Sequence, residues 1–159
     1  MNDDNLCLLM ELIEGDDLGT ILEENKTVDP AFAQMVTREV LNALQYMHSM
    51  GIFHGDVKAQ NIMITKDYKV KLIDFGCSNY FETNDKNSAV VESIEKFKAK
   101  LNLAELDEFN GTSFYASPEL IETGINSWKD DFWSLGVVVY QMLTGKLPFE
   151  GETDYLTFQ

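Results

Sequence analysis

The stretch His54-Gly-Asp-Val-Lys-Ala-Gln-Asn61 is polar and lies between two segments with different hydrophobic periodicities. Upstream, apolar residues recur at helical spacing, and the Asp-Pro pair at residues 29–30 predicts a helix start because Asp caps a helix and Pro fits its first turn. Downstream, residues 61–65 and 69–73 are typical of two hairpin strands, the second alternating polar and apolar side chains. The stretch is therefore predicted to be a loop between a long helix and a β-hairpin.

Four further segments have patterns typical of regular structure. Residues 6–13 form an almost continuous apolar run of strand length, which predicts a strand buried on both faces. A short helix is predicted at 18–24, and an amphipathic helix within residues 88–106 of a long polar stretch. Residues 130–144 are mostly apolar and end before a glycine, which predicts a buried helix. Since the helical share exceeds the strand share, the predicted fold class is α+β.

The composition limits the kinds of partner. The chain has 159 residues, of which 45% are hydrophobic, enough for one domain with a buried core. Its formal charge of -15 argues against binding nucleic acid or anionic lipid through a basic face. No apolar stretch has the length of a membrane-spanning helix, and two cysteines are too few for a disulfide scaffold. We therefore expect a cytoplasmic protein with no nucleic-acid partner and no direct membrane segment.

Three short motifs follow one another along the chain: H-G-D-V-K-A-Q-N at residues 54–61, D-F-G at 74–76 and S-P-E at 117–119. Each is weak alone. In this order they resemble the H-R-D-L-x-x-x-N, D-F-G and A-P-E motifs of the eukaryotic protein kinase family. Within that family, the Ser-Pro-Glu-Leu variant, Tyr140-Gln141 and residues 154–159 are similar to the 3-phosphoinositide-dependent protein kinases, which act on serine and threonine.

The resemblance covers essentially the whole chain and implies a protein-kinase-like fold. This fold would be mainly the α-helical C-lobe, with a short catalytic-loop β-hairpin and one N-lobe strand. Residues 1–159 would form a partial kinase domain, with a hinge strand at 5–13, the C-lobe at 16–159 and the activation segment at 74–119. Nothing upstream supplies the family's glycine-rich loop or strand lysine, so we expect a fragment that is inactive alone.

The resemblance also implies the chemistry: transfer of the ATP γ-phosphoryl group to a protein hydroxyl, with ATP and Mg²⁺ as cofactors. Asp56 matches the carboxylate that accepts the hydroxyl proton, and Lys58 would neutralise the transferred group. Asn61 and Asp74 match the two metal ligands, since Mg²⁺ prefers oxygen donors. Thr112 matches the residue that joins the substrate platform to the catalytic loop. The substrate would be a protein, with other kinases among the candidates.

Five residues match the family's nucleotide site. Met10 would be the gatekeeper, and the hinge from Glu11 to Ile13 would bind adenine through main-chain groups, which any side chain allows. Asp17 falls where a carboxylate often meets the ribose, and Met63 falls under the adenine ring.

Five further residues match structural supports. His54 would pack beneath Phe75 rather than act as a base, and Gly76 completes the D-F-G motif. Glu119 belongs to the S-P-E motif, and Asp131 matches a buried helix aspartate that braces the main chain of the catalytic loop.

The chain departs from the family pattern at three places. Gly55 replaces the arginine of H-R-D, and Glu108 stands where relatives carry a phosphoserine, so we expect activity that does not depend on phosphorylation there. Residues 88–106 are either a docking helix or, more simply, a surface insertion. These departures leave a second hypothesis open, a non-catalytic pseudokinase-like or protein-docking module.

Overall fold

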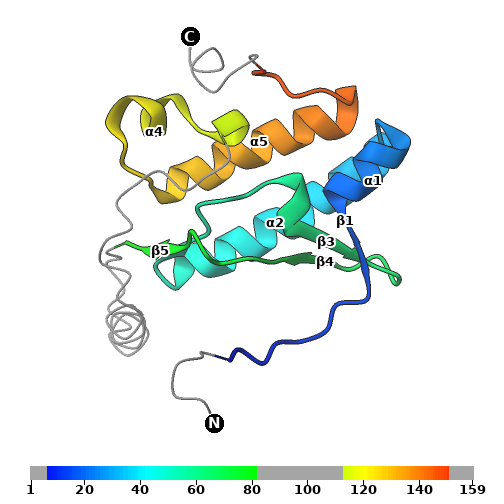
Figure 1. Ribbon diagram of the computed structural model, residues 1–159, viewed down its shortest axis with the longest axis horizontal. Coiled ribbons are helices and arrows are strands. Elements are labelled where there is room, and N and C mark those ends of the chain that lie inside the picture. The colour runs from blue at the N-terminus through cyan, green and yellow to red at the C-terminus, as the bar shows by residue number, and fades with distance from the viewer. Residues whose placement is uncertain (1–6, 82–112, 151–159) are drawn as a thin grey trace.

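The computed structural model describes residues 7–81 and 113–150 (Figure 1). The predicted helix within 88–106, Glu108 and Thr112 lie outside the described residues. The elements follow one another as β1 (Gly15–Asp17), α1 (Leu18–Asn25), α2 (Pro30–Ser49), β2 (Ile52–Phe53), the 3₁₀ helix η1 (Ala59–Asn61), β3 (Ile62–Thr65), β4 (Val70–Leu72), β5 (Asn79–Tyr80), the 3₁₀ helix η3 (Ser113–Tyr115), α4 (Pro118–Thr123) and α5 (Trp128–Thr144).

Two small antiparallel sheets frame the polar loop. The first has the strand order β1-β3-β4, and its β3–β4 pair confirms the predicted hairpin. A Cβ on Gly15 would lie 2.1 Å from the carbonyl oxygen of Ile64, so only glycine allows β1 to approach β3 this closely. The second sheet pairs β2 with β5, in the order Ile52 to Tyr80 and Phe53 to Asn79. It joins the two ends of the segment that carries the first two motifs, and the sequence did not predict it.

The helices α2 and α5 lie side by side and supply most of the core (Figure 1). Their ends confirm the sequence prediction: Asp29 caps α2 through the N–H of Ala31, and α5 ends at Gly145, whose φ of +70° suits glycine. The buried residues recur every three or four positions, namely Ala33, Val36, Val40 and Leu44 on α2 and Leu135, Val138 and Met142 on α5. Among the described residues, no helix combines the length and the apolar character that crossing a membrane requires.

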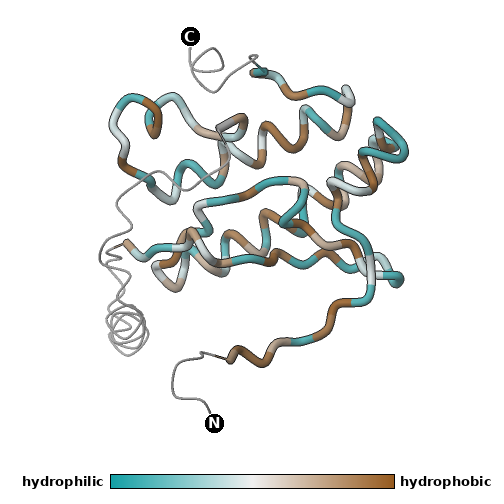
Figure 2. The backbone as a smooth tube through the Cα atoms, in the orientation of Figure 1, coloured by the Kyte–Doolittle hydropathy of each residue, from teal (hydrophilic) through white to brown (hydrophobic). Residues whose placement is uncertain are grey.

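The predicted strand at 6–13 is wrong for the described residues 7–13. They are extended but belong to no strand, and Leu8, Leu9, Met10 and Leu12 are exposed. Figure 2 shows this hydrophobic segment running away from the sheets. The physical reason is that a strand requires hydrogen-bond partners, which hydrophobicity alone does not provide. Pairing begins where the main-chain N–H of Lys66 donates to the carbonyl oxygen of Glu14.

Candidate active site

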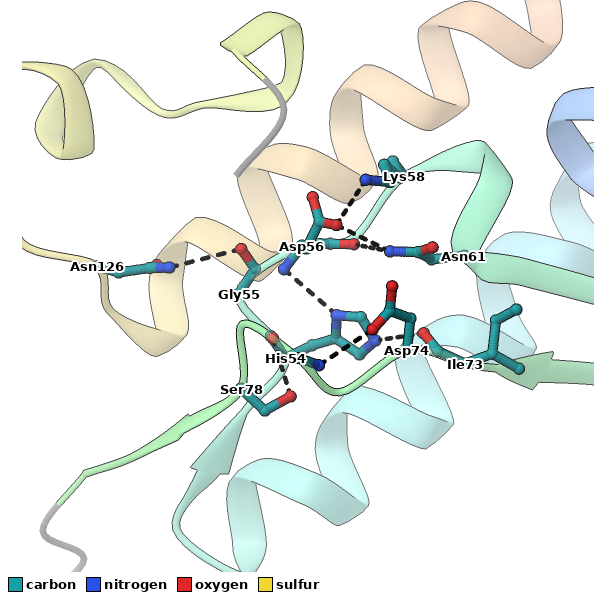
Figure 3. A network of polar contacts seen from close by, with 10 residues as sticks. His54, Gly55, Asp56, Lys58, Asn61, Ile73, Asp74, Ser78 and Asn126 are labelled. Carbon is teal, nitrogen blue, oxygen red and sulfur yellow. Dashed lines mark hydrogen bonds and ion pairs between the residues drawn. The ribbon is translucent and has the colours of Figure 1, made fainter. Parts of the chain in front are cut away.

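The catalytic-loop residues Asp56, Lys58 and Asn61 converge on one carboxylate oxygen. The Nζ of Lys58 lies 2.6 Å from Oδ2 of Asp56, and the Nδ2 of Asn61 donates to the same oxygen at 3.0 Å. Asn61 also donates to the main-chain oxygen of Asp56 at 2.8 Å, which closes the loop on itself (Figure 3). All three side chains lie mostly out of solvent, where charged hydrogen bonds hold their geometry well.

Asp74 lies beside this group although it follows another strand. The N–H of Ile73 donates to the carbonyl oxygen of Asn61 at 3.0 Å, which fastens the chain just before Asp74 to the catalytic loop. Asp74 has a φ of +62°, a region that Asp tolerates better than most residues, and its Oδ1 accepts the N–H of Gly76 at 3.1 Å. In Figure 3 its carboxylate points toward Asn61.

The Cys77 thiol feels the negative charge of both Asp56 and Asp74. Burial raises the pKa of the Cys77 thiol, and the charges of Asp56 and Asp74 raise it further. The geometric link between the two segments is the hydrogen bond from the N–H of Ile73 to the carbonyl oxygen of Asn61. The arrangement therefore brings together two carboxylates, an amide and an ammonium group from two separate segments.

His54 supports this loop as a buried neutral imidazole. Its Nδ1 accepts the N–H of Asp56 at 3.3 Å, and its Nε2 donates to the carbonyl oxygen of Ile73 at 3.1 Å, which together assign the Nε2–H tautomer. Burial lowers the pKa of His54 and outweighs the nearby carboxylates of Asp131, Asp56 and Asp74, which raise it. The Phe75 ring lies 5.3 Å from the imidazole, centroid to centroid. His54 therefore has no free nitrogen for proton transfer.

Asp131, on the first turn of α5, holds the main chain of the loop. Its Oδ2 accepts the N–H of His54 and its Oδ1 accepts the N–H of Gly55, both at 2.9 Å. The Nε2 of His48, in the last turn of α2, lies 2.7 Å from Oδ2. The side chain of Asp131 is 1% exposed, so these contacts form away from water. One buried carboxylate thus joins α2, α5 and the catalytic loop.

The preceding aspartate, Asp130, organises the S-P-E motif, and sequence reasoning missed this role. Its Oδ1 accepts the hydroxyl of Ser117, which caps α4 by accepting the N–H of Leu120. Its Oδ2 accepts the N–H of Ser127 and so completes a capping box at the start of α5. The Ser-x-x-Asp spacing of residues 127–130 is the signal that could have found it. Glu119 is exposed and makes no ion pair with the described residues.

Of the predicted nucleotide residues, Asp17 and Met63 lie in the first sheet, whereas Met10, Glu11 and Ile13 lie in the extended segment before it. Asp17 in β1 pairs with Met63 in β3, and this pair lies at the end of the sheet next to the catalytic loop. Partial burial raises the pKa of Asp17, but hydrogen bonds from the hydroxyl and N–H of Thr20 outweigh it, so the net pKa is lowered. Glu11 reaches the same sheet because both its carboxylate oxygens lie 2.6 Å from Nζ of Lys71.

Met10 and Ile13 differ in exposure. Met10 is 79% exposed, whereas Ile13 is partly buried. The exposure of these side chains does not bear on the predicted hinge, because a hinge would bind adenine through its main chain.

The side-chain oxygens of Asn61 and Asp74 suit a Mg²⁺ ion that phosphate groups also bind. The Nδ2 of Asn61 is turned to Asp56, which directs the amide oxygen away from that carboxylate. Among residues 7–81 and 113–150, no group of three or more His, Cys, Asp and Glu side chains could hold a metal ion alone. Mg²⁺ commonly takes one or two protein oxygens and completes its shell with phosphate and water. The residues present therefore match that metal rather than one held by protein alone.

Comparison with known proteins agrees with this geometry. The protein kinase domain family matches residues 1–159. The serine/threonine-protein kinase PKH2 of Saccharomyces cerevisiae is 30% identical over 99% of this chain, which covers 14% of that protein. The 3-phosphoinositide-dependent protein kinase 1 of Arabidopsis thaliana is 32% identical over 98% of this chain, which covers 30% of it. The serine/threonine-protein kinase ppk11 of Schizosaccharomyces pombe is 37% identical over 92% of this chain, which covers 41% of it. The chain thus spans less than half the length of each of these relatives.

Proposed function

The chain belongs to the protein kinase domain family, and we propose that it carries the phosphoryl-transfer site of a serine/threonine kinase. The reaction moves the γ-phosphoryl group of ATP to a hydroxyl of a protein substrate, with other kinases among the candidate substrates. The observation that carries the proposal is the convergence of Asp56, Lys58 and Asn61 with Asp74. Similarity to relatives named serine/threonine-protein kinases supports the choice of acceptor hydroxyl.

In this proposal, Asp56 orients the substrate hydroxyl and accepts its proton. The donors Lys58 and Asn61 hold its Oδ2 and so reduce the freedom of the carboxylate before the substrate arrives. The ammonium group of Lys58 also lies where it can offset negative charge on the transferred phosphoryl group. Asp56 and Lys58 therefore supply alignment and charge compensation, which are the main demands of phosphoryl transfer.

Asn61 and Asp74 are the proposed Mg²⁺ ligands, and Mg²⁺ supplies neutralisation of the phosphate charge when bound. Asp17 and Met63 are proposed to contact the ribose and adenine. The main chain from Glu11 to Ile13 is proposed to bind the adenine edge, with Met10 as the gatekeeper. Thr112 is proposed to join the substrate platform to this group. The proposed site of action is the cytoplasm, where ATP and protein substrates meet.

The test uses the full-length protein, the proposed substrate class and radiolabelled ATP. We expect Asp56→Asn to lower phosphoryl transfer by about 100-fold or more, because general-base catalysis contributes on the order of 10²–10⁴. The rise in melting temperature with Mg·ATP should persist in this variant, since Asp56 is not proposed to hold the nucleotide. The matched control is Asp67→Asn, an exposed carboxylate in the β3–β4 turn, which should transfer at the wild-type rate.

The alternative outcome is equally definite. A wild-type protein that neither transfers phosphate nor gains thermal stability with Mg·ATP would be a non-catalytic docking module. Transfer that survives Asp56→Asn would remove Asp56 from the role of base.

A further inference from the structure

The extended segment before β1 is fastened to the first sheet by charged side chains. Both carboxylate oxygens of Glu11 lie 2.6 Å from Nζ of Lys71 in β4. In the part of the chain that the structure describes, residues 7–13 belong to no strand. The Glu11–Lys71 pair therefore links the predicted hinge to β4 across 60 positions of the chain.

Lys71 is also part of a row of three residues that crosses the first sheet. It is the direct partner of Met63 in β3, and Met63 is the direct partner of Asp17 in β1. Direct partners on neighbouring antiparallel strands point to the same face of a sheet. On the opposite face, Ile62 and Ile64 are buried in the core. The row of Asp17, Met63 and Lys71 therefore lies on the outer face of the sheet, which is turned away from the core.

The outer face is where the proposed nucleotide contacts meet. Met63 is proposed to lie under the adenine, and the main chain from Glu11 to Ile13 to bind its edge. Hydrogen bonds to the edge of the base have donor–acceptor distances of about 2.7–3.2 Å, so the hinge main chain has to lie at one height above Met63. The Glu11 carboxylate is bound on this face by the residue that pairs directly with Met63. The ion pair thus determines where the hinge lies relative to the residue under the base.

We propose that Lys71 is a positioning residue of the nucleotide site: by binding the carboxylate of Glu11, it holds the main chain of the predicted hinge at the height above Met63 that the adenine requires. Lys71 acts through Glu11 and does not touch the nucleotide. The side chain of Lys71 is 35% exposed and that of Glu11 is 66% exposed, so water and salt weaken the pair and its effect on nucleotide affinity is moderate. The inference rests on the proposed function and names what aligns the base in it.

Charge reversal in the full-length protein tests this, in the single variants Glu11→Lys and Lys71→Glu and in the double variant that combines them. Each single variant places two like charges side by side, whereas the double variant restores an opposite pair with the original net charge. The matched control is the same set of changes at Glu14 and Lys66, a pair whose side chains are 69% and 80% exposed and whose charged atoms lie 3.2 Å apart. The control pair joins the same chain segment to the same hairpin but lies beyond the row that carries Met63.

The readouts are KM for ATP, kcat, KM for the protein substrate and the rate of amide hydrogen exchange in residues 8–13. We expect Glu11→Lys and Lys71→Glu to raise KM for ATP by about threefold, which is the size of effect that a partly exposed ion pair produces. The kcat at saturating ATP and KM for the protein substrate should stay at their wild-type values, since the catalytic loop is not moved. Exchange in residues 8–13 should become faster.

The double variant should return both KM for ATP and the exchange rate to their wild-type values. The difference in KM between each single variant and the wild type should shrink in about 1 M salt, because salt screens the charges. The control variants should keep the wild-type KM for ATP within about 1.5-fold, since a pair this exposed contributes little.

A KM for ATP in Glu11→Lys that equals that of Glu14→Lys would overturn the proposal, and so would a double variant whose KM for ATP stays raised. If a variant at Lys71 does not fold, Glu11→Lys carries the test alone, because the Glu11 side chain lies mostly in water. A wild-type protein that neither transfers phosphate nor gains thermal stability with Mg·ATP would instead reject the proposed function. Amide exchange would still decide whether Lys71 holds the hinge segment, and exchange in Lys71→Glu as slow as in the wild type would overturn this attachment.

Discussion

Replacing Asp131 by alanine should remove much of the protein's stability, because one carboxylate satisfies three buried donors. These are the main-chain N–H groups of His54 and Gly55, at 2.9 Å each, and Nε2 of His48, at 2.7 Å. In Asp131→Ala the two N–H groups stay buried without an acceptor. Each such group costs about 1–3 kcal/mol, so the main chain alone contributes about 2–6 kcal/mol.

Breaking one partner of a buried polar pair costs about 3–5 kcal/mol in other proteins, which falls inside the same range. We therefore expect the free energy of unfolding to fall by about 4 kcal/mol, a large share of the 5–15 kcal/mol that is typical of native proteins. Asp131→Asn keeps one oxygen acceptor but turns an amide N–H toward another donor. Its free energy of unfolding should therefore fall by about half as much as that of Asp131→Ala.

Urea denaturation of the full-length protein measures this loss. The slope of the free energy against urea should stay constant, which shows that the variant unfolds from the same native state. The control is Asp16→Ala, an exposed aspartate in β1, which should change stability by less than about 0.5 kcal/mol. A loss below about 1 kcal/mol in Asp131→Ala would refute the reasoning, since it would mean that water or another group replaces the carboxylate.

Three further outcomes are expected. The pKa of His54 is lowered in the folded protein, so the unfolded chain binds more protons below pH 6.5. The free energy of unfolding should therefore fall with decreasing pH, by at most about 1.4 kcal/mol per pH unit. Urea denaturation at pH 7.5 and 5.5 should show a smaller fall in His54→Phe than in the wild type, and an equal fall would contradict the neutral imidazole. Leu44→Ala should cost about 2–5 kcal/mol because Leu44 is fully buried, whereas Leu41→Ala on the exposed face of the same helix should cost less than about 1 kcal/mol by thermal denaturation. Ser117→Ala should cost about 1–2 kcal/mol, since it removes both the α4 cap and the partner of Asp130, and a neutral result would show that the cap is dispensable.

Local features of the fold were predictable from the sequence. The start of α2 at Asp29-Pro30, the end of α5 at Gly145 and the β3–β4 hairpin all depend on residues close together in the chain. Caps, left-handed glycines and turn residues act over three or four positions, so their effect can be seen before any tertiary structure is known. The strand prediction at 6–13 was wrong because a strand depends on a partner edge, which a local hydrophobic run does not specify.

The identity of the candidate site residues also came from the sequence, through short motifs whose side chains have the right chemistry. Their arrangement did not. Asp131 accepts the N–H of His54 across 77 residues of chain, and the ion pair of Glu11 with Lys71 depends on how the extended segment lies against β4. Distances between remote segments are set by how helices and sheets pack against a shared core. The sequence thus determined which donors and acceptors are available, and only the tertiary structure decided which of them meet.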